Sequence, residues 1–277
     1  MITEDKKNQI SRSFDSLAPA RPRWKRQNRY YYSKINEYFR FLVPEGVRVL
    51  EIGSGDGELL AALKPSKGLG IDASPSFVEM ARARFPHLEF RRDFAESFRL
   101  GPDEEKFDVI ILSDLVGYLD DVQAVFENLL QACKPSTRII VNYYNYLWEP
   151  ALKLGAKIGL NMPQGPNNWL SLADLENLFH ISGFETVKKT RKLLLPVYLP
   201  LISGFFNRVL ANLPLLRKCC LAEFIAARPH PGPAGAPSVS VVVPCRNEKG
   251  NILELVERLP EFPGGSELIF VDRKSVV

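Results

Sequence analysis

Short apolar runs alternate with helix-forming segments through most of the chain. The runs that predict strands lie at residues 47–52, 68–72, 88–91, 107–112 and 137–143. The first of them, residues 47–52, is rich in β-branched and aliphatic residues, as is typical of a strand buried on both faces. Helical patterns follow several of them, at residues 58–63, 75–80 and 122–133. Strands alternating with helices predict an α/β fold with a parallel sheet.

Residues 1–45 precede this pattern and are predicted to be helical. Their middle, residues 21–32, is both basic and aromatic. We expect its charged side chains to be solvated. The tyrosines have two interpretations: Tyr31 packs with Ile35, Tyr38 and Phe39 at helical spacing, or the segment covers a ligand.

A glycine-rich turn ends the first strand. Gly53, Gly55 and Gly57 permit positive φ and a close approach of the backbone to a ligand, and the following helix presents free N–H groups. A dinucleotide fingerprint needs a third glycine where this chain has Glu58. The carboxylate of Glu51, inside the strand, suits a cation better than a pyrophosphate. Both features weigh against NAD or FAD.

The order Glu-x-Gly-x-Gly-x-Gly after an apolar strand resembles the first motif of the class I S-adenosylmethionine-dependent methyltransferases. The resemblance implies a Rossmann-like, mostly parallel seven-stranded sheet with helices on both faces, and S-adenosylmethionine as cofactor. It implies that the glycine turn cradles the amino-acid end of the cofactor. The expected cofactor contacts are Glu51, Gly53, Ser54, Gly55, Gly57, Asp72, Ala73, Asp93, Phe94 and Ser113.

Two acids carry specific expectations. Asp72 ends the second strand about 20 residues beyond the turn, where an acid meets ribose hydroxyls in such folds. Ser74, before Pro75, is the better helix cap, which would leave Asp72 free for the ligand. In similar methyltransferases an acid at the position of Asp93 accepts from the adenine amino group, and its neighbour, here Phe94, packs on the ring.

The sequence indicates the residues that contact the methyl acceptor less clearly than those that contact the cofactor. Asp114 and Tyr118 follow the fourth strand and are candidates for contact with the acceptor. Tyr118 stands near the position where family members often carry a histidine, so a histidine base is in doubt and no catalytic residue is assigned. Residues 144–170 are polar, aromatic and loop-like; they shape the acceptor pocket or pack under a long loop. The expected chemistry is in-line methyl transfer to oxygen, nitrogen or carbon.

An apolar stretch at residues 193–206 lies between basic groups. It is too short and too proline-broken to span a bilayer. It is either an interfacial segment anchored by basic residues or a core or oligomer-facing cap. The candidate anchors are Arg191, Lys192, Arg208, Arg217 and Lys218. Before it, Ser171 is expected to cap a helix over 172–180, and after it residues 221–227 resemble the last, antiparallel strand of the family's sheet.

Residues 229–237 are rich in proline and glycine and predict a linker between a methyltransferase domain at 46–228 and a separate segment at 238–277. That segment resembles the opening of a family 2 (GT-A) glycosyltransferase, with two strands and a helix ending at Asp272. Only the opening is present, so we expect no sugar transfer. Residues 272–277 resemble translated adapter sequence. An alternative function is therefore a methyltransferase-like, non-catalytic module of a glycosyltransferase fusion in envelope glycan or lipid synthesis.

Net charge, cysteine content and the N-terminal residues limit the partners and the compartment that we expect. A formal net charge of +4 over 277 residues is too small to indicate nucleic acid. Four cysteines without metal-ligand spacing predict no metal site and fit a reducing compartment. Charges near the N-terminus argue against a signal peptide. We expect a cytoplasmic protein, peripheral to the membrane at most, whose acceptor is a small molecule or is linked to lipid or glycan.

Overall fold

The computed structural model describes residues 4–162, 168–230, 238–245, 252–260, 262 and 264–272. The chain divides into two compact units, Met1–His230 and Pro231–Val277. The expected linker at 229–237 begins inside a strand, because Pro229 still belongs to the last strand of the first unit and His230 N donates to Gly183 O at 2.8 Å. Residues 231–237 lie outside the described residues.

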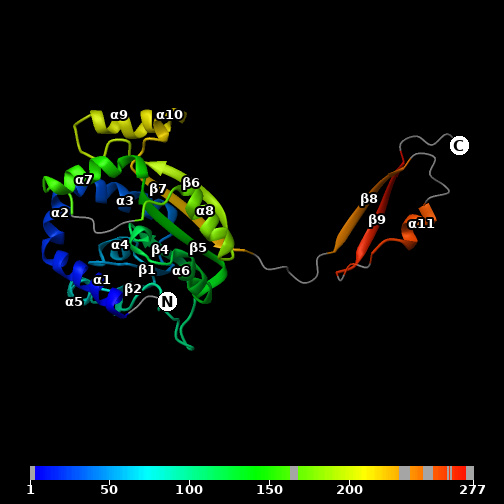
Figure 1. Cartoon of the computed structure of the whole chain (residues 1–277), viewed down its shortest axis with the longest axis horizontal. Coiled ribbons are helices and arrows are strands. Elements are labelled where there is room, and N and C mark those ends of the chain that lie inside the picture. The colour runs from blue at the N-terminus through cyan, green and yellow to red at the C-terminus, as the bar shows by residue number, and fades with distance from the viewer. Residues whose placement is uncertain are drawn as a thin grey trace. The chain divides into compact units, whose positions relative to one another are not determined.

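The first unit is built on a seven-stranded sheet in the order β3-β2-β1-β4-β5-β7-β6 (Figure 1). Strands β1 to β5 pair in parallel, and β7 runs antiparallel to both β5 and β6. The strands are β1 Arg48–Ile52, β2 Lys67–Asp72, β3 Glu89–Arg92, β4 Phe107–Ser113, β5 Cys133–Tyr144, β6 Phe184–Lys192 and β7 Ala222–Pro229. The mostly parallel seven-stranded sheet is therefore confirmed.

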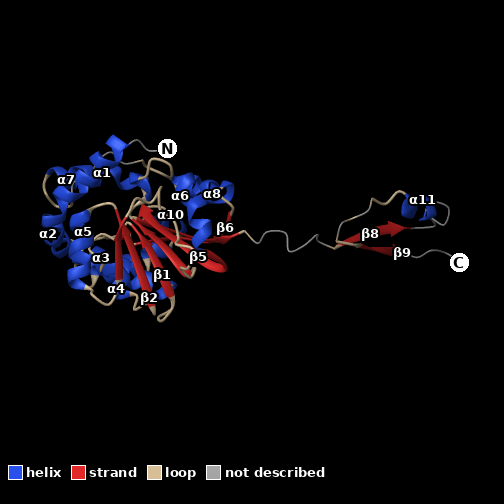
Figure 2. Cartoon of the chain, turned by 90° about the horizontal axis from the view of Figure 1, so that it is seen from below, coloured by secondary structure: helices blue, strands red, loops and turns tan. Residues whose placement is uncertain are grey.

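Helices cover both faces of this sheet (Figure 2). They are α3 Arg29–Leu42, α4 Glu58–Ala62, α5 Pro75–Arg84, α6 Val122–Leu129 and α8 Leu172–Ile181. In β1, Leu50 and Ile52 belong to one buried cluster with α6 and α8, while Val49 belongs to the other with α3, α4 and α5. Alternate side chains of this strand therefore pack into two different cores, which explains its uninterrupted apolar run.

Two helices and a 3₁₀ turn from the start of the chain cover the carboxyl ends of the strands. They are α1 Glu4–Leu17, the turn Ala18–Ala20 and α2 Arg21–Gln27. Ser11 Oγ donates to Ala73 O at 3.0 Å, and the Asp15 carboxylate accepts from Ser76 N at 3.2 Å and from the Ser74 hydroxyl. These bonds tie α1 to the start of α5.

Two elements differ from expectation. The helix α7 Glu149–Lys157 and a 3₁₀ turn, Tyr146–Trp148, occupy part of the stretch expected to be loop. Pro150 starts that helix at a position where its missing N–H costs nothing. The edge strand β6 was not predicted, because Lys188, Lys189 and Arg191 on its partly solvated surface hide the apolar signal. The segment 163–167 of the expected acceptor loop lies outside the described residues.

The remaining helices of the first unit are α9 Ile202–Arg208, a 3₁₀ turn Leu210–Asn212, and α10 Pro214–Arg217; two more 3₁₀ turns are Val116–Tyr118 and Leu130–Ala132. The second unit contains β8 Val239–Cys245, α11 Ile252–Glu257 and β9 Ser266–Asp272, with β8 and β9 paired in parallel. Among the described residues, none of the helices combines the length and apolarity needed to cross a membrane.

Candidate functional site

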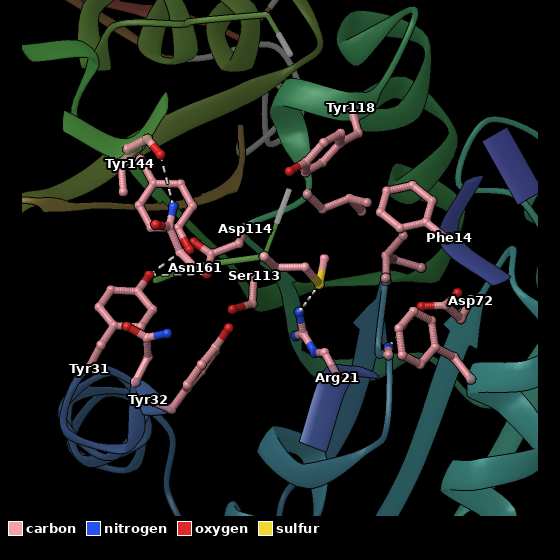
Figure 3. Close-up of a pocket in the computed structure, with 18 of the residues that line it drawn as sticks. Phe14, Arg21, Tyr31, Tyr32, Asp72, Ser113, Asp114, Tyr118, Tyr144 and Asn161 are labelled. Atoms are coloured by element: carbon pink, nitrogen blue, oxygen red, sulfur yellow. Dashed lines mark hydrogen bonds between the residues drawn. The ribbon is translucent and has the colours of Figure 1, made fainter. Parts of the chain in front are cut away.

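A cavity of about 320 Å³ opens at the carboxyl ends of β1, β2 and β4. It lies where the strand order reverses between β1 and β4, the usual position for ligands in open α/β sheets. Its wall also takes residues from α1, α2, α3, α7 and the loop before α9 (Figure 3). Segments far apart in the sequence therefore share one hollow.

The glycine turn borders the cavity at Gly53 and Gly55. Gly53, Gly55 and Gly57 have φ of +74°, +52° and +74°, which side chains rarely tolerate. A Cβ on Gly57 would lie 2.6 Å from Phe90 Cζ, and one on Gly53 would lie 2.9 Å from Leu115 Cδ1. The turn thus needs glycine for both its conformation and its packing.

Asp72, at the end of β2, lines the cavity, and both of its carboxylate oxygens accept hydrogen bonds from the backbone. Its Oδ2 accepts from Gly55 N at 2.8 Å and its Oδ1 accepts from Ser74 N at 2.9 Å. Ser74 caps α5 as expected, since its Oγ accepts from Phe77 N at 3.2 Å. Asp72 thus reaches the cavity as expected, although its carboxylate also accepts two backbone hydrogen bonds that the sequence did not predict. The carboxylate fixes the glycine turn, and burial raises its pKa despite these bonds.

The next strand contributes Asp93 and Phe94, which both line the cavity. Asp93 Oδ1 accepts from Phe94 N at 2.7 Å and from Ser97 Oγ at 3.0 Å, so the backbone fixes this carboxylate as well. Ala73 and Ser113 also line the cavity. Seven of the ten expected cofactor contacts therefore meet in one place.

The other three, Glu51, Ser54 and Gly57, do not reach the cavity wall. Glu51 is 2% exposed, and its Oε2 has no hydrogen-bond partner among the described residues. Burial raises the pKa of its carboxyl to about 8, against the opposing attraction of Lys25. Glu51 is a buried acid behind the turn rather than a wall residue.

Asp114 and Tyr118, the two acceptor candidates, both line the cavity. The Asp114 carboxylate accepts from Tyr31 Oη at 3.1 Å and from Asn142 Nδ2 at 3.0 Å, and Tyr144 also hydrogen-bonds to it. Burial raises its pKa to about 6, although these bonds favour the charged form. Asp114 has φ of +51°, a strained conformation that places this carboxylate among the tyrosines.

Aromatic rings surround this acid (Figure 3). Tyr31 stacks on Tyr144 with ring centroids 5.8 Å apart, and Tyr118 meets the edge of Phe14 at 5.3 Å. Burial raises the pKa of Tyr118 to about 12, so its phenol stays protonated at neutral pH. Of the two open interpretations of the N-terminal tyrosines, packing at helical spacing holds for Tyr31, which is buried; Tyr31 also lines the cavity, and covering of a ligand stays a prediction.

The basic N-terminal segment contradicts the expectation of solvated charges at two positions. Arg21 lines the cavity, with its guanidinium carbon 5.6 Å from the centre of the Tyr32 ring, and its buried Nε has no hydrogen-bond partner within the ranges that the structure describes. Lys25 Nζ lies 2.6 Å from Asp56 Oδ1 and 2.9 Å from Glu58 Oε2. The helix α2 is therefore anchored by charge to the glycine turn and to α4.

Another part of the wall is formed by α7, the residues after it and the loop before α9, and its members are Leu152, Gly155, Leu160, Asn161, Met162, Pro196 and Val197. The first five lie in the stretch 144–170, which was expected either to shape the acceptor pocket or to pack under a long loop. Pro196 and Val197, which follow β6, were not expected at the cavity. Within the described part of the chain, no group of three or more His, Cys, Asp or Glu side chains could hold a metal ion.

Comparison with known proteins gives a family match. A family model described as a methyltransferase domain matches residues 23–189. An ubiquinone biosynthesis O-methyltransferase from Chelativorans is 31% identical over 160 residues, covering 53% of this chain and 62% of the relative. A demethylmenaquinone methyltransferase from Chlorobaculum tepidum is 24% identical, covering 49% and 59%. The chain thus spans about three fifths of the length of these relatives.

Solved structures agree on the fold. An S-adenosylmethionine-dependent methyltransferase from Thermotoga maritima superposes with a TM-score of 0.61 at 21% identity, covering 78% of this chain and 98% of that one. At this identity the likeness concerns the architecture alone.

Proposed function

Because the chain belongs to the methyltransferase domain family, whose model it matches over residues 23–189, we propose that it transfers a methyl group from S-adenosylmethionine to an acceptor hydroxyl. The observation that carries this proposal is a cavity with two chemically distinct halves. One half holds the glycine turn, Asp72 and Asp93, and the other holds Asp114 among tyrosines and aliphatic side chains.

The residues of the first half fit the cofactor. S-Adenosylmethionine carries a carboxylate, an ammonium, ribose hydroxyls and an adenine ring. Arg21 brings a guanidinium with an unpartnered, buried Nε to the glycine end of the cavity, which suits a carboxylate. The carboxylates of Asp72 and Asp93 suit hydroxyl and amino donors further along. S-Adenosylmethionine, when bound, supplies the electrophilic methyl group.

The expected cofactor residues then take two roles. Residues that line the cavity are proposed to contact the cofactor, and these are Gly53, Gly55, Asp72, Ala73, Asp93, Phe94 and Ser113. Glu51, Ser54 and Gly57 are proposed to support the turn from behind. Glu51, whose pKa is raised to about 8 by burial, would be mostly protonated at neutral pH and would support the turn as a neutral acid.

Asp114 is proposed to receive the acceptor's proton. The Asp114 carboxylate, which the hydrogen bonds from Tyr31 and Asn142 hold in place, would accept the hydroxyl proton of an acceptor bound beside it. S-Adenosylmethionine, if bound, would supply the methyl group through cleavage of its S–CH₃ bond and leave as S-adenosylhomocysteine. A base with a pKa near 6 is ionised at neutral pH and still accepts a proton. The tyrosines exclude water and orient a planar or apolar acceptor.

The acceptor class follows from the lining of the second half. Leu152, Leu160, Met162 and Val197 favour an apolar body, while Asp114 favours a hydroxyl. We therefore propose a small-molecule acceptor or one linked to lipid or glycan, with an apolar, hydroxyl-bearing molecule preferred. The relative named an ubiquinone biosynthesis O-methyltransferase supports a hydroxyl acceptor.

Two measurements test this function. Calorimetry should show binding of S-adenosylhomocysteine and no binding of NADH; the reverse result would end the proposal. Labelled methyl transfer should then be assayed against quinols, phenols, and fractionated lipid and glycan extracts. Cofactor binding without transfer to any hydroxyl compound would favour the alternative of a non-catalytic module.

For the second unit we propose a βαβ unit of the kind that opens a family 2 glycosyltransferase. Its support is the parallel pairing of β8 with β9 around α11 and the position of Asp272 at the end of β9. The turn at 246–250 and the tail at 273–277, including the adapter-like residues, lie outside the described residues. Binding of a nucleoside diphosphate that is lost on Asp272→Asn would support this proposal, and unchanged binding would contradict it.

A further inference from the structure

Exposed apolar side chains concentrate on one part of the first unit. Of the 23 large hydrophobic side chains exposed in the described residues, 15 lie within residues 146–160 and 197–216. We call these two segments together the apolar face. Single exposed apolar residues are normal, but a group of this size marks an interaction surface.

The two segments of the apolar face are joined side by side. Trp148 Nε1 donates to Cys219 O at 2.8 Å, and Asn145 Nδ2 donates to Cys220 O at 2.9 Å. Figure 1 shows α7 and α9 at the same end of the first unit. Both segments also reach the cavity, since Leu160 and Val197 are exposed and line it. The apolar face therefore surrounds part of the cavity's rim.

The polarity of α9 is inverted relative to an ordinary surface helix. Ser203 is 1% exposed, and its Oγ accepts from Leu199 N at 2.6 Å and donates to Val197 O at 2.7 Å. Asn207, one turn later, donates to Tyr30 Oη at 3.1 Å. Phe205, on the other side, is 54% exposed. The helix thus turns Ser203 and Asn207 to the protein and leaves the apolar Ile202 and Phe205 exposed.

Leu201 shows the same inversion at a cost in backbone strain. It has φ of +63° and is 93% exposed. A leucine in this conformation is disfavoured, and its side chain makes little contact within the unit. An apolar side chain held outward at a strained backbone position is expected where the protein contacts an apolar environment outside itself.

The charged residues of the apolar face indicate which apolar environment it contacts. Residues 193–221 contain no Asp or Glu, and Arg208, Arg217 and Lys218 are all exposed among them. In α7 the acid Glu149 is paired with Lys153 at 2.5 Å. An apolar surface flanked by uncompensated cations matches the interface of an anionic bilayer, where apolar area and basic residues act together.

The candidate anchors on β6 do not belong to this set. Arg191 Nε lies 2.6 Å from Glu223 Oε1, and the Lys192 ammonium lies 5.2 Å from the centre of the Tyr38 ring. Both are therefore engaged within the unit. Three of the five anchors expected from the sequence remain available: Arg208, Arg217 and Lys218.

We propose that the apolar face docks the protein onto an anionic phospholipid bilayer, with Leu201, Phe205 and Leu215 inserted and Arg208, Arg217 and Lys218 at the headgroups. Docking in this way brings the cavity rim to the bilayer. An acceptor dissolved in the membrane then reaches Asp114 without crossing water, a consequence that rests on the proposed function.

The test is vesicle flotation of the full chain, using phosphatidylcholine vesicles with and without phosphatidylglycerol. We expect binding to anionic vesicles that falls with added salt. An insertion variant (L201S/F205S/L215S) and a charge variant (R208Q/R217Q/K218Q) should each bind roughly tenfold more weakly or worse, about 1.4 kcal/mol. The matched control, F41S/I181S/V187S, changes three exposed apolar residues elsewhere and should bind like the wild type.

Folding and cofactor binding are followed separately in each variant by circular dichroism and by calorimetry with S-adenosylhomocysteine. Lost flotation with retained cofactor binding supports the docking surface, whereas lost cofactor binding in the wild type would refute the proposed function alone. Three results overturn docking: no flotation of the wild type, equal loss in the control variant, or a dimer in sedimentation that the insertion variant dissociates. The last would make a second copy the occupant.

Discussion

Glu51 offers a direct test of the buried electrostatics behind the glycine turn. Its carboxyl is 2% exposed, and burial raises its pKa from 4.5 to about 8. A folded pKa above the unfolded one means that the folded protein holds this proton more tightly. The resulting stabilisation is complete below pH 4.5 and is lost as the pH rises to about 8.

The magnitude follows from the size of this shift. Each pKa unit corresponds to about 1.4 kcal/mol, so the shift from 4.5 to about 8 amounts to roughly 5 kcal/mol. The perturbation is Glu51→Gln, which keeps the shape and stays neutral at every pH. Relative to this variant, the wild type should lose about 1.4 kcal/mol of unfolding free energy per pH unit across that window.

The assay is urea unfolding at several pH values, followed by tryptophan fluorescence without added cofactor. Trp24, Trp148 and Trp169 all lie in the first unit, so the signal reports that unit. Glu79→Gln, at an exposed glutamate of α5, is the control and should follow the wild type. A constant difference between the wild type and Glu51→Gln over the whole range would refute the reasoning.

Three more predictions address the turn and the cavity. Asp72→Ala should weaken S-adenosylhomocysteine binding by roughly 1.5–3 kcal/mol in calorimetry; unchanged affinity would remove Asp72 from the site. Gly57→Ala puts a Cβ 2.6 Å from Phe90 at a φ of +74° and should lower unfolding free energy by roughly 1–3 kcal/mol, while Gly204→Ala, which meets nothing, should not. The methyl-transfer rate should rise with pH through about 6 and become pH-independent in Asp114→Asn; matching profiles would exclude Asp114 as the base.

The sheet and the cofactor half of the cavity were predictable because their signals are local. A continuous apolar run followed by glycines identifies a buried strand and its turn, and parallel strands place Gly53, Asp72 and Asp93 at one edge of the sheet. The position of each residue at a strand end was sufficient. No knowledge of long-range packing was needed.

The acceptor half could not be predicted in this way. Its wall combines α3, α7 and the loop before α9, and nothing local in the sequence brings Tyr31 to Asp114, 3.1 Å away. Helix α7 also carried too few apolar residues to stand out from a loop. The engagement of Asp72 by backbone N–H groups depends on the fold of the turn itself, which spacing alone does not reveal.

The ion pairs between α2 and the glycine turn bear on how this end of the cavity responds to salt. Lys25 pairs with Asp56 and Glu58, and Phe14 and Arg21 wall the same end of the cavity. The side chains of Lys25 and Asp56 are only 15% and 3% exposed, so added salt screens this pair weakly. On the proposed function, the N-terminal helices would therefore keep the cofactor end covered at high ionic strength as well as at low.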